Sequence, residues 1–413
     1  MDSNKHNSRA PKFRFPGFEG EWEEKTFGEL YKKNNVKNDL SFGVDKIISV
    51  ANMYFKPDAN VGDEEYLKSY NIFRLGDIAY EGNKSANYAY GRFVENTIGD
   101  GIVSHVFDVY TPISKDHCLG YWKYAINYER IMRPVLEKST IKSTMMTNLI
   151  AKDFLKQKTL VPSLAEQQII SECLEAEDRM ISAQEQKVEA LKERKQGLMQ
   201  QLFPRSGETT PRLRFPGFTG EWKEKKMSDV FTRITRRNAE NNQNVLTISA
   251  QYGLISQLEF FKKSVAASDV TGYYLLKKGE FAYNKSSSQG RPFGAIKPLR
   301  LYDKGVVSTL YICFKCNDPR EIDFWDQYFD AGLLDKELMS IAQEGARNHG
   351  LLNIPTSGFF NLSVFSPSID EQQEIALCLS ALDDTIQVET DKLEALKDHK
   401  KGLMQQLFPQ PTK

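Results

Sequence analysis

Two short polar segments carry side chains of the kind that contact nucleic acids. The first lies between Glu81 and Arg92, and the second lies between Asn284 and Arg291. Both mix lysine and arginine, which suit phosphates, with asparagine, glutamine and serine, which suit base edges. The residues predicted to contact DNA here are Lys84, Ser85, Asn87, Tyr88, Arg92, Asn284, Lys285, Ser286, Gln289 and Arg291. A solvated polar loop without a ligand is the alternative for each of them.

Side-chain chemistry divides these residues between bases and phosphates, and the sequence offers further candidates elsewhere. Those best suited to bases are Asn87, Gln289, Arg92 and Arg291, and those best suited to phosphates are Lys84 and Lys285. Matching positions near the end of each domain, and a basic cluster after the second turn, add Lys142, Ser143, Thr144, Arg347, Asn348, His349, Arg233, Arg236 and Arg237. Lys32 and Lys33 form a similar cluster in the first half, and such clusters indicate phosphate contacts.

No enzyme motif accompanies these segments. The sequence has neither a G-x-x-x-x-G-K-[ST] phosphate loop nor a G-x-G-x-x-G motif. It also lacks the N/D-P-P-Y/F signature of amino-methyltransferases. Glu81 and Lys84 superficially resemble part of a nuclease site, but the second polar segment has no acid in place of Glu81. A strand end followed by a loop is the preferred interpretation, and no catalytic residue is predicted.

Cysteine and histidine spacing predicts no metal site. Cys313 and Cys316 form a lone C-x-x-C inside an apolar stretch, without a second pair nearby. The five histidines are not at ligand spacing, and the odd number of cysteines, five, argues against a disulfide framework. We therefore expect neither a metal nor another cofactor in this chain.

The elements that position the polar segments occur twice in the chain. PKFRFPGFEGEWEEK at 11–25 recurs as PRLRFPGFTGEWKEK at an offset of 200. PSLAEQQII at Pro162 recurs as PSIDEQQEI, and LKERKQGLMQQLFP at Leu191 recurs as LKDHKKGLMQQLFP, both at an offset of 205. The motifs follow the same order in both halves, so the chain is a tandem duplication.

The two copies have diverged unevenly. Their ends are nearly identical, whereas the middles, roughly 26–160 and 226–365, match only at isolated motifs. We infer that the ends do one common job twice and that the middles do related but different jobs. Faster drift of loops than of cores is the alternative. Here, however, whole domains have drifted while surface-rich helices have not.

Each half is predicted to contain three parts. A turn comes first, because Pro16-Gly17 and Pro216-Gly217 suit the central positions of a type II turn. A mixed domain of short strands and helices follows, and a long helix closes the half. The predicted fold class is α+β, with two tandem mixed α/β domains at 1–160 and 206–365, each followed by a helical region, at 161–205 and 366–413.

Both long helices carry apolar residues at heptad spacing on one face. These seam positions are Ile170, Leu174, Ile181, Val188, Leu191, Leu198, Leu202, Ile375, Leu379, Leu382, Ile386, Leu393, Leu396, Leu403 and Leu407. Polar residues interrupt both seams in the same register, namely Gln184 and Glu389, and Lys195 and Lys400. We expect the helices to pair as an antiparallel coiled coil, with a domain near each end and an approximate two-fold axis.

Aromatic residues at the ends of both copies have more than one interpretation. The pairs Leu202-Phe203 and Leu407-Phe408 either cap the coiled coil or dock a partner, and both remain open. For the tryptophans that follow the turns, Trp22 and Trp222, packing against the helices is preferred over stacking on nucleic acid.

Glycine is repeated inside the helical pattern. Gly197 and Gly402 lie where glycine costs about 1 kcal/mol relative to alanine. Their repetition indicates a close approach of the helices, with fraying of the helix end as the alternative.

Charge is distributed unevenly along a chain whose formal net charge is zero. Residues 166–205 hold 8 acidic and 6 basic residues, and 370–409 hold 9 and 4, which leaves +7 for the remainder. This basic remainder fits a nucleic-acid partner. The sequence has no apolar run of about 18 residues, so no membrane span is predicted. The polar N-terminus has no signal-peptide pattern. We therefore expect a cytoplasmic protein without a membrane partner.

The RFPGFxGEW, P-S-x-x-E-Q-Q and LMQQLFP segments, twice in this order, resemble the specificity (S, HsdS) subunit of type I restriction–modification enzymes. The resemblance covers nearly the whole chain. It implies two target-recognition domains, each recognising one half of a bipartite site in double-stranded DNA. The antiparallel coiled coil then sets the gap and docks two modification subunits.

The resemblance also implies that partner subunits carry the chemistry. Modification subunits would bring S-adenosylmethionine for adenine methylation, and restriction subunits would add ATP- and Mg-dependent translocation and cleavage. The chain itself is then not an enzyme.

Two other classes of function are open. A coiled-coil adaptor explains the helices but not two large divergent domains, and it predicts no salt-dependent binding to duplex DNA. A stand-alone nuclease or methyltransferase lacks its motifs, and it would be active as the pure chain.

Overall fold

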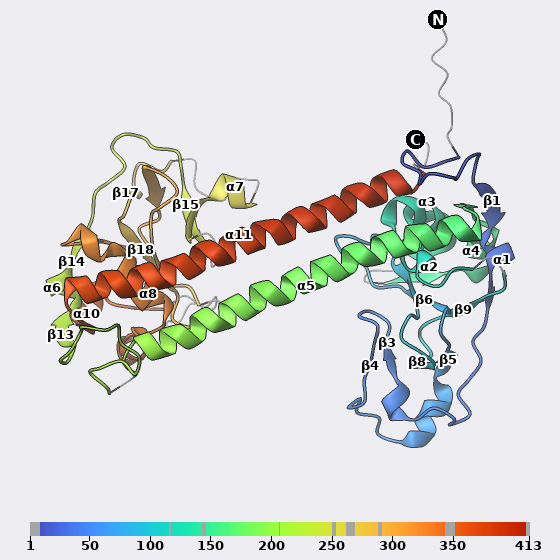
Figure 1. Ribbon diagram of the computed structural model, residues 1–413, viewed down its shortest axis with the longest axis horizontal. Coiled ribbons are helices and arrows are strands. Elements are labelled where there is room, and N and C mark those ends of the chain that lie inside the picture. Colours follow the sequence, from blue (N-terminus) through green and yellow to red (C-terminus); the bar gives the residue numbers. More distant parts are fainter. Residues whose placement is uncertain are drawn as a thin grey trace, which may run out of the picture. The chain divides into compact units, whose positions relative to one another are not determined.

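The computed structural model divides into two compact units. The structure describes residues 9–114, 117–142, 146–205, 207–249, 253–261, 269–287, 291–342 and 352–409. Unit 1 comprises Met1–Glu185 and Lys392–Lys413, and unit 2 comprises Gln186–Asp391. The long helices α5 (Leu164–Leu202) and α11 (Ile369–Leu407) each contribute to both units (Figure 1). The predicted domain boundaries follow the sequence repeat, whereas the compact units divide both helices.

Unit 1 is built on an antiparallel four-stranded sheet in the order β2-β9-β6-β7. Its globular elements are β1 (Glu23–Thr26), α1 (Phe27–Leu30), β2 (Tyr31–Lys33), β3 (Ile48–Ser49), β4 (Tyr54–Phe55), β5 (Asn71–Phe73), β6 (Ile78–Glu81), β7 (Arg92–Glu95), β8 (Gly101–Val103), β9 (Val109–Pro112), α2 (Tyr121–Ala125), α3 (Glu129–Ser139), β10 (Thr140–Lys142), β11 (Thr147–Leu149), α4 (Ala151–Lys156) and β12 (Lys158–Val161), with 3₁₀ turns at Val44–Lys46 and Glu64–Ser69. Buried aromatic side chains, including Phe93, Tyr110 and Phe154, form its main core.

Unit 2 repeats this sheet with the order β14-β21-β18-β19. Its globular elements are β13 (Lys223–Lys226), α6 (Met227–Val230), β14 (Phe231–Ile234), β15 (Leu246–Ser249), β16 (Gly253–Ser256), α7 (Gln257–Phe261), β17 (Tyr274–Lys277), β18 (Phe281–Asn284), β19 (Ala295–Pro298), β20 (Lys304–Val307), β21 (Ile312–Cys316), α8 (Ile322–Asp330), α9 (Asp335–Ile341), α10 (Thr356–Asn361) and β22 (Ser363–Ser366), with a 3₁₀ turn at Pro319–Glu321. The common strand order extends the sequence repeat to the fold.

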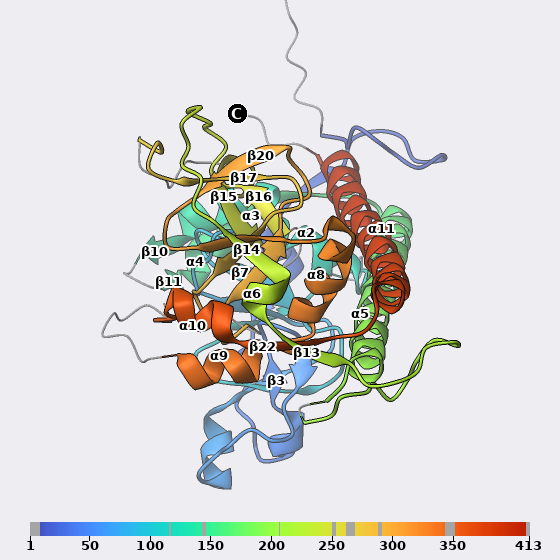
Figure 2. The ribbon, with the colours of Figure 1, turned by 90° about the vertical axis from the view of Figure 1, so that its left-hand side faces the viewer.

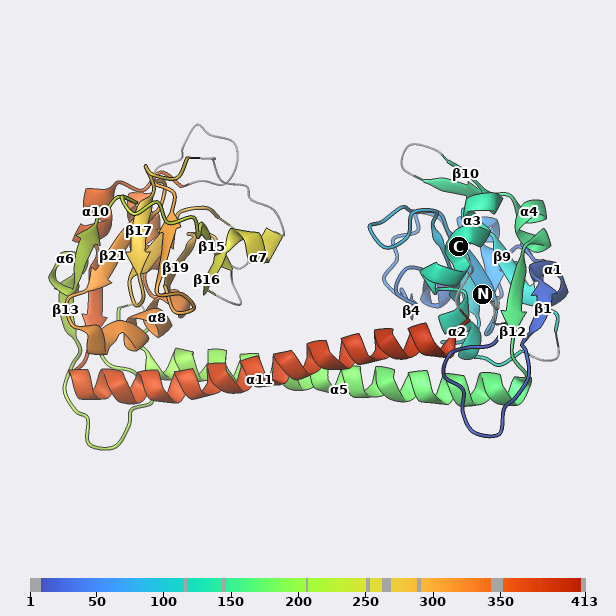
Figure 3. The same cartoon turned by 90° about the horizontal axis from the view of Figure 1, so that it is seen from above.

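The start and the end of each globular domain lie side by side. Strand β1 pairs antiparallel with β12, and β13 pairs with β22 in the corresponding way (Figure 3). A capping box follows β1, because Thr26 accepts a hydrogen bond from the Glu29 backbone and the Glu29 carboxylate accepts one from Thr26. Each long helix therefore leaves its domain next to the strand through which the chain entered.

The predicted type II turns are confirmed in both copies. Gly17 and Gly217 have φ of 92° and 94°, as the third position of this turn requires. The backbone amides of Phe18 and Phe218 donate to the carbonyl oxygens of Phe15 and Phe215, each over 3.4 Å.

The arginine of each RFPGF segment binds a glutamate at the start of a long helix. Arg14 donates from Nε and Nη2 to the two carboxylate oxygens of Glu166, both over 2.8 Å. Arg214 binds Glu371 in the same fork, over 2.6 and 2.7 Å. Glu166 and Glu371 are each 1% exposed, and a bidentate pair of this kind fixes geometry as well as charge. The two repeated motifs RFPGF and P-S-x-x-E-Q-Q therefore form one joint.

The heptad seam predicted for the long helices is buried or half-buried along its whole length. Within unit 1, Lys397 and Lys400 of α11 bind Glu185 and Asp178 of α5. The partners run in opposite directions along the chain, so these helix segments are antiparallel. Lys195 binds Asp383 within unit 2 in the same manner. The predicted fold class is confirmed: two sheet-rich regions are each followed by a long helix, and these helices pack together.

The ends of both long helices are part of the globular cores. Phe408 is fully buried in unit 1, where its ring centroid lies 6.4 Å from that of Trp22. Phe203 packs against Trp222 in unit 2 with a separation of 6.1 Å. The Leu-Phe ends thus pack against the domain that the other helix follows, and the preferred packing role of the tryptophans is confirmed.

The close helix approach expected at the repeated glycines is wrong. A Cβ atom added at Gly197 or at Gly402 would meet no atom within 4 Å. No close backbone contact therefore requires glycine at either position.

Replacing Phe408 with alanine is expected to lower the free energy of unfolding by about 3–5 kcal/mol, because it leaves a cavity in place of a buried ring. Val388→Ala on the same helix is the control, since Val388 is 65% exposed; a change within about 0.5 kcal/mol is expected there. Chemical denaturation of the full chain measures both. A loss below about 1 kcal/mol for Phe408→Ala would contradict the packing described above.

Candidate nucleic-acid interface

The predicted polar segments lie at one end of the four-stranded sheet in each unit. In unit 1 the segment joins β6 to β7, and Glu81 faces Arg92 in the ladder between these strands. In unit 2 the segment joins β18 to β19, and Asn284 faces Ala295. Equivalent loops of the repeated fold therefore carry the two sets of candidate residues.

In unit 1 the β10-β11 hairpin, which contains the candidate Lys142, lies beside the β6-β7 loop. The amide of Thr147 donates to the carbonyl oxygen of Gly82 over 2.8 Å, and Asn83 forms an isolated bridge with Met146. The Tyr80 hydroxyl also lies 2.6 Å from the Thr147 hydroxyl. The β10-β11 hairpin that contains Lys142 is thus fixed next to the β6-β7 loop, so the structure brings together two segments that are about 60 residues apart in the sequence.

Several candidates of these segments lie outside the described residues: Ser143, Thr144, Gln289, Arg347, Asn348 and His349. Lys142 is described by its backbone, as the last residue of β10. In unit 2, the Leu352 amide donates to the Lys285 carbonyl oxygen over 3.0 Å. In unit 2 the chain that follows the candidates Arg347, Asn348 and His349 therefore contacts the β18-β19 loop.

The arginines at the ends of both loops bind acidic groups of their own domain. Arg92 donates from Nε to Glu81 over 2.7 Å and from Nη2 to the Ala51 carbonyl oxygen over 2.8 Å. Its guanidinium also lies 5.1 Å from the ring centre of Tyr88. Arg291 binds the carboxylate and the carbonyl oxygen of Asp330 over 3.0 and 3.1 Å. Both arginines hold their loops in place here, and their contacts to bases stay predictions.

The residues between these arginines differ in their exposure. Ser85 and Asn87 are exposed, whereas Lys84 and Tyr88 are half-buried. Asn284, Lys285 and Ser286 are half-buried in the other loop, and burial lowers the pKa of Lys285. Asn87 is thus the candidate for base contact whose side chain is most open to a ligand among those the structure describes.

The basic cluster of unit 2 contains residues with different environments. Arg233 is exposed on β14. Arg236 is held by the Glu280 carboxylate over 2.8 and 3.0 Å, and Arg237 lies over the Tyr274 ring at 5.0 Å. In unit 1, Lys33 binds Asp108 over 2.8 Å while Lys32 is exposed. Exposed Lys32 and Arg233 are best placed for phosphates.

Sequence inspection missed the β3-β4 hairpin as a neighbour of the candidate interface. Its turn follows Ser49, and the Ala51 carbonyl oxygen is one of the acceptors of Arg92. Asn52, beside Ala51, is exposed. The asparagine in a short connection between two strands was the available signal, but only the contact with Arg92 places it near the loop.

The C-x-x-C motif does not bring its thiols to one place. Cys313 lies in a core cluster with Leu276 and Val307, whereas Cys316 lies in the main core of unit 2. Positions three apart on a strand face opposite sides. Burial raises the pKa of Cys313 to about 12 and raises that of Cys316. Among the described residues, no group of three or more histidines, cysteines and acids could hold a metal ion.

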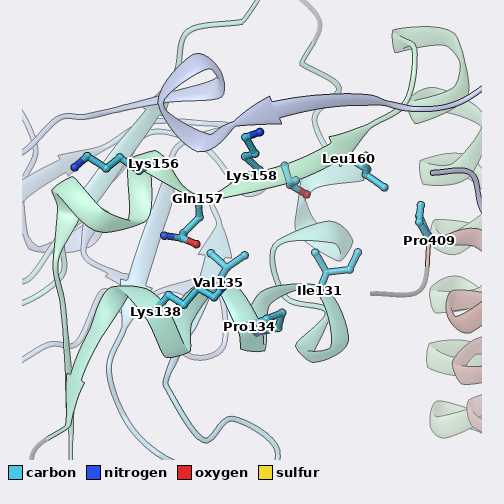
Figure 4. Close-up of a pocket in the computed structure, with 10 residues that line it drawn as sticks. Ile131, Pro134, Val135, Lys138, Lys156, Gln157, Lys158, Leu160 and Pro409 are labelled. Carbon is cyan, nitrogen blue, oxygen red and sulfur yellow. The ribbon is translucent and has the colours of Figure 1, made fainter. Parts of the chain in front are cut away.

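A groove of about 380 Å³ opens on unit 1 (Figure 4). Apolar side chains such as Ile131 and Leu160 line it beside Pro409, and Lys138 and Lys156 border it. The described lining includes none of the residues predicted to contact DNA. The groove and the candidate interface are therefore different surfaces.

Among the described residues, no helix has the length and apolar composition that a membrane span requires.

This chain is similar to known proteins in its structure. No protein-family profile matches the sequence, and no curated protein matches it. The S subunit of a type I restriction–modification system from M. genitalium has a TM-score of 0.55 at 12% identity, covering 98% of this chain and 100% of its own. A chain from a study of complex assembly and conformational transition of the type I R-M system has 0.52 at 12%, covering 95% and 98%. The HsdS subunit from Thermoanaerobacter tengcongensis has 0.43 at 14%, covering 97% and 99%.

At these identities the likeness shows the fold. The S subunit from M. genitalium matches almost from end to end, so this chain has the fold of a type I S subunit. The resemblance found in the repeated motifs is confirmed at this level.

Replacing Arg92 with alanine is expected to lower the free energy of unfolding by about 1–3 kcal/mol, because the largely buried Glu81 carboxylate loses its partner. Lys68→Ala is the matched control, since Lys68 forms an exposed ion pair with Glu65 and its loss is expected to cost at most about 1 kcal/mol. Thermal denaturation of the full chain compares them. Equal effects of both substitutions would show that Arg92 does not support its loop.

Proposed function

We propose that the chain is the specificity subunit of a type I restriction–modification complex. Each globular domain recognises one half of a bipartite DNA site, and the paired helices set the gap and dock two modification subunits. The observation that carries this proposal is the duplicated architecture, which matches a type I S subunit over 98% of the chain. Duplex DNA has a two-fold symmetry of its own, which suits two recognition domains at a fixed spacing.

The uneven divergence of the two copies supports recognition of two unlike half-sites. The joints formed by Arg14 with Glu166 and by Arg214 with Glu371 are equivalent. The loops at the sheet ends, 82–91 and 285–294, have the same length but differ in their residues, with Asn87 in one and Lys285 in the other. A common frame therefore presents different polar side chains, and this is what two different base sequences require.

The chemistry of the complex is assigned to its partners. Modification subunits would methylate adenine with S-adenosylmethionine, and restriction subunits would use ATP and Mg. In this proposal the chain is not an enzyme, and its contribution is to place the modification subunits at the right sequence.

Adenine-methylation mapping tests the proposal in a host that carries this chain with its modification subunits. A host lacking only this chain is the control. A bipartite motif with two unlike halves and a fixed gap, gained only with the chain, is expected. An unchanged pattern, with modification subunits shown to be active and bound, would favour the coiled-coil adaptor instead.

Asn87→Ala is expected to relax base preference at one position of a single half-site, with a loss of about 1–3 kcal/mol in discrimination, because a side chain that contacts base edges is removed. Competition binding by the assembled complex against duplexes altered at each position measures this. The second half-site is the internal control. Unchanged preference at every position would remove Asn87 from the interface.

Arg233→Ala is expected to weaken binding to all duplexes alike, because a phosphate contact carries no sequence information. The slope of log affinity against log salt should become shallower by about 0.9. Titrations at several salt concentrations measure the slope. A loss of preference for particular bases with an unchanged slope would contradict the assignment to phosphate.

A further inference from the structure

Two aspartates at equivalent positions join a recognition domain to both long helices. Asp178 lies on α5 and Asp383 on α11, at the offset of 205 that relates the repeated helices. Both are half-buried. Neither stands at a seam position of the heptad pattern.

Asp383 binds groups from two other elements of unit 2. It accepts hydrogen bonds from Lys195 Nζ of α5 at both carboxylate oxygens, over 2.6 and 2.7 Å. It also accepts one from Gln327 Nε2 of α8, over 2.7 Å. Helix α8 belongs to the recognition domain and lies beside α11 (Figure 2). One carboxylate thus joins the domain to the two helices.

Asp178 has the same arrangement in unit 1. It accepts hydrogen bonds from Lys400 Nζ of α11 and, over 2.6 Å, from the Tyr124 hydroxyl of α2. The Lys123 ammonium lies 3.4 Å away. Burial raises the pKa of Asp178, but hydrogen bonds from Lys400 and Tyr124 outweigh it, so the pKa lies below its usual range. The carboxylate is therefore charged at neutral pH.

Helices α2 and α8 are equivalent parts of the repeated domains. Each contains a buried aromatic residue directly followed by a buried tryptophan, Tyr121-Trp122 in α2 and Phe324-Trp325 in α8. The two junctions therefore use the same helix of the fold with different side chains, Tyr124 in one and Gln327 in the other.

Both helices are also tied to the strand that follows the predicted DNA-contacting loop. In unit 2, Asp326 and Asp330 of α8 bind Lys297 of β19, and Asp330 binds Arg291 at the end of the loop. In unit 1, Glu95 at the end of β7 accepts hydrogen bonds from the backbone amides of Gly120 and Lys123 over 3.2 and 2.9 Å. Polar contacts therefore connect each aspartate, through the helix of its domain, with the strand that follows the loop.

We propose that Asp178 and Asp383 are positioning residues that fix the orientation of each recognition domain on the helix pair, and through it the gap between the half-sites. This inference rests on the proposed function. Apolar contacts between these surfaces tolerate rotation, whereas a charged carboxylate with donors from two elements is directional. It also explains why Lys195 and Lys400 interrupt the heptad seams, since each is the helix partner of one of these aspartates.

The test compares gap preference in complexes of the full chain with its modification subunits. Methylation is measured on sites with the native gap and with gaps one base pair shorter and longer. Asp383→Ala is expected to keep both half-site sequences but to lower the preference for the native gap by at least about 10-fold, an effect of about 1.4 kcal/mol. Asp178→Ala should do the same from the other domain.

Lys187→Ala is the matched control, because Lys187 binds Glu389 and this ion pair joins the two helices. It should leave the gap preference unchanged. Gln327→Ala removes the domain side of the junction while keeping the pair of Lys195 with Asp383, and it provides the test if Asp383→Ala does not fold.

The outcomes separate this inference from the proposed function. If the unsubstituted chain directs no bipartite methylation, the proposed function fails. If it does, and the Asp383→Ala or Gln327→Ala complex assembles with the unsubstituted gap preference, the positioning role is wrong. Loss of base preference within a half-site at an unchanged gap would equally overturn it.

Discussion

The structure depends on the burial of two apolar helix faces that neither helix can cover alone. Each of α5 and α11 is 39 residues long, about 58 Å at the usual rise. A strip of apolar side chains over this length is stable only against a partner, and the tandem duplication supplies that partner in the same chain. Antiparallel pairing brings the end of each helix to the domain that the other helix follows. Phe408 therefore completes the core around Trp22, and Phe203 the core around Trp222.

This constraint explains why the copies kept their ends and changed their middles. The buried pairs of Arg14 with Glu166 and of Arg214 with Glu371 sit where the turn meets the start of the helix, and removing one partner would leave a buried charge alone. Those residues are fixed by geometry in both copies. The loops at the sheet ends contact water and their own domain, so they can vary without loss of the frame. A duplicated frame with freely varying loops suits the recognition of two unlike sequences.

The sequence was sufficient for features that depend on local or periodic patterns. The FPGF turns, the heptad seams and the repeated order of elements were predicted because glycine conformation and apolar spacing reveal them directly. Contacts between distant segments were not accessible. Nothing near Arg92 indicated its bonds to Glu81 and Ala51, and the close helix approach expected at Gly197 was wrong. The burial of Phe408 in the first domain, 386 residues after Trp22, likewise required the fold.

In the proposed function, equivalent joints hold two different recognition domains. Exchange of residues 26–160 and 226–365 within the chain tests it most directly, with adenine-methylation mapping of the exchanged chain and its modification subunits. Because the exchange is equivalent to a rotation about the predicted two-fold axis, the same bipartite motif with the same gap is expected. Loss of methylation by an assembled complex, or a motif with a different gap or altered halves, would contradict the equivalence of the two joints.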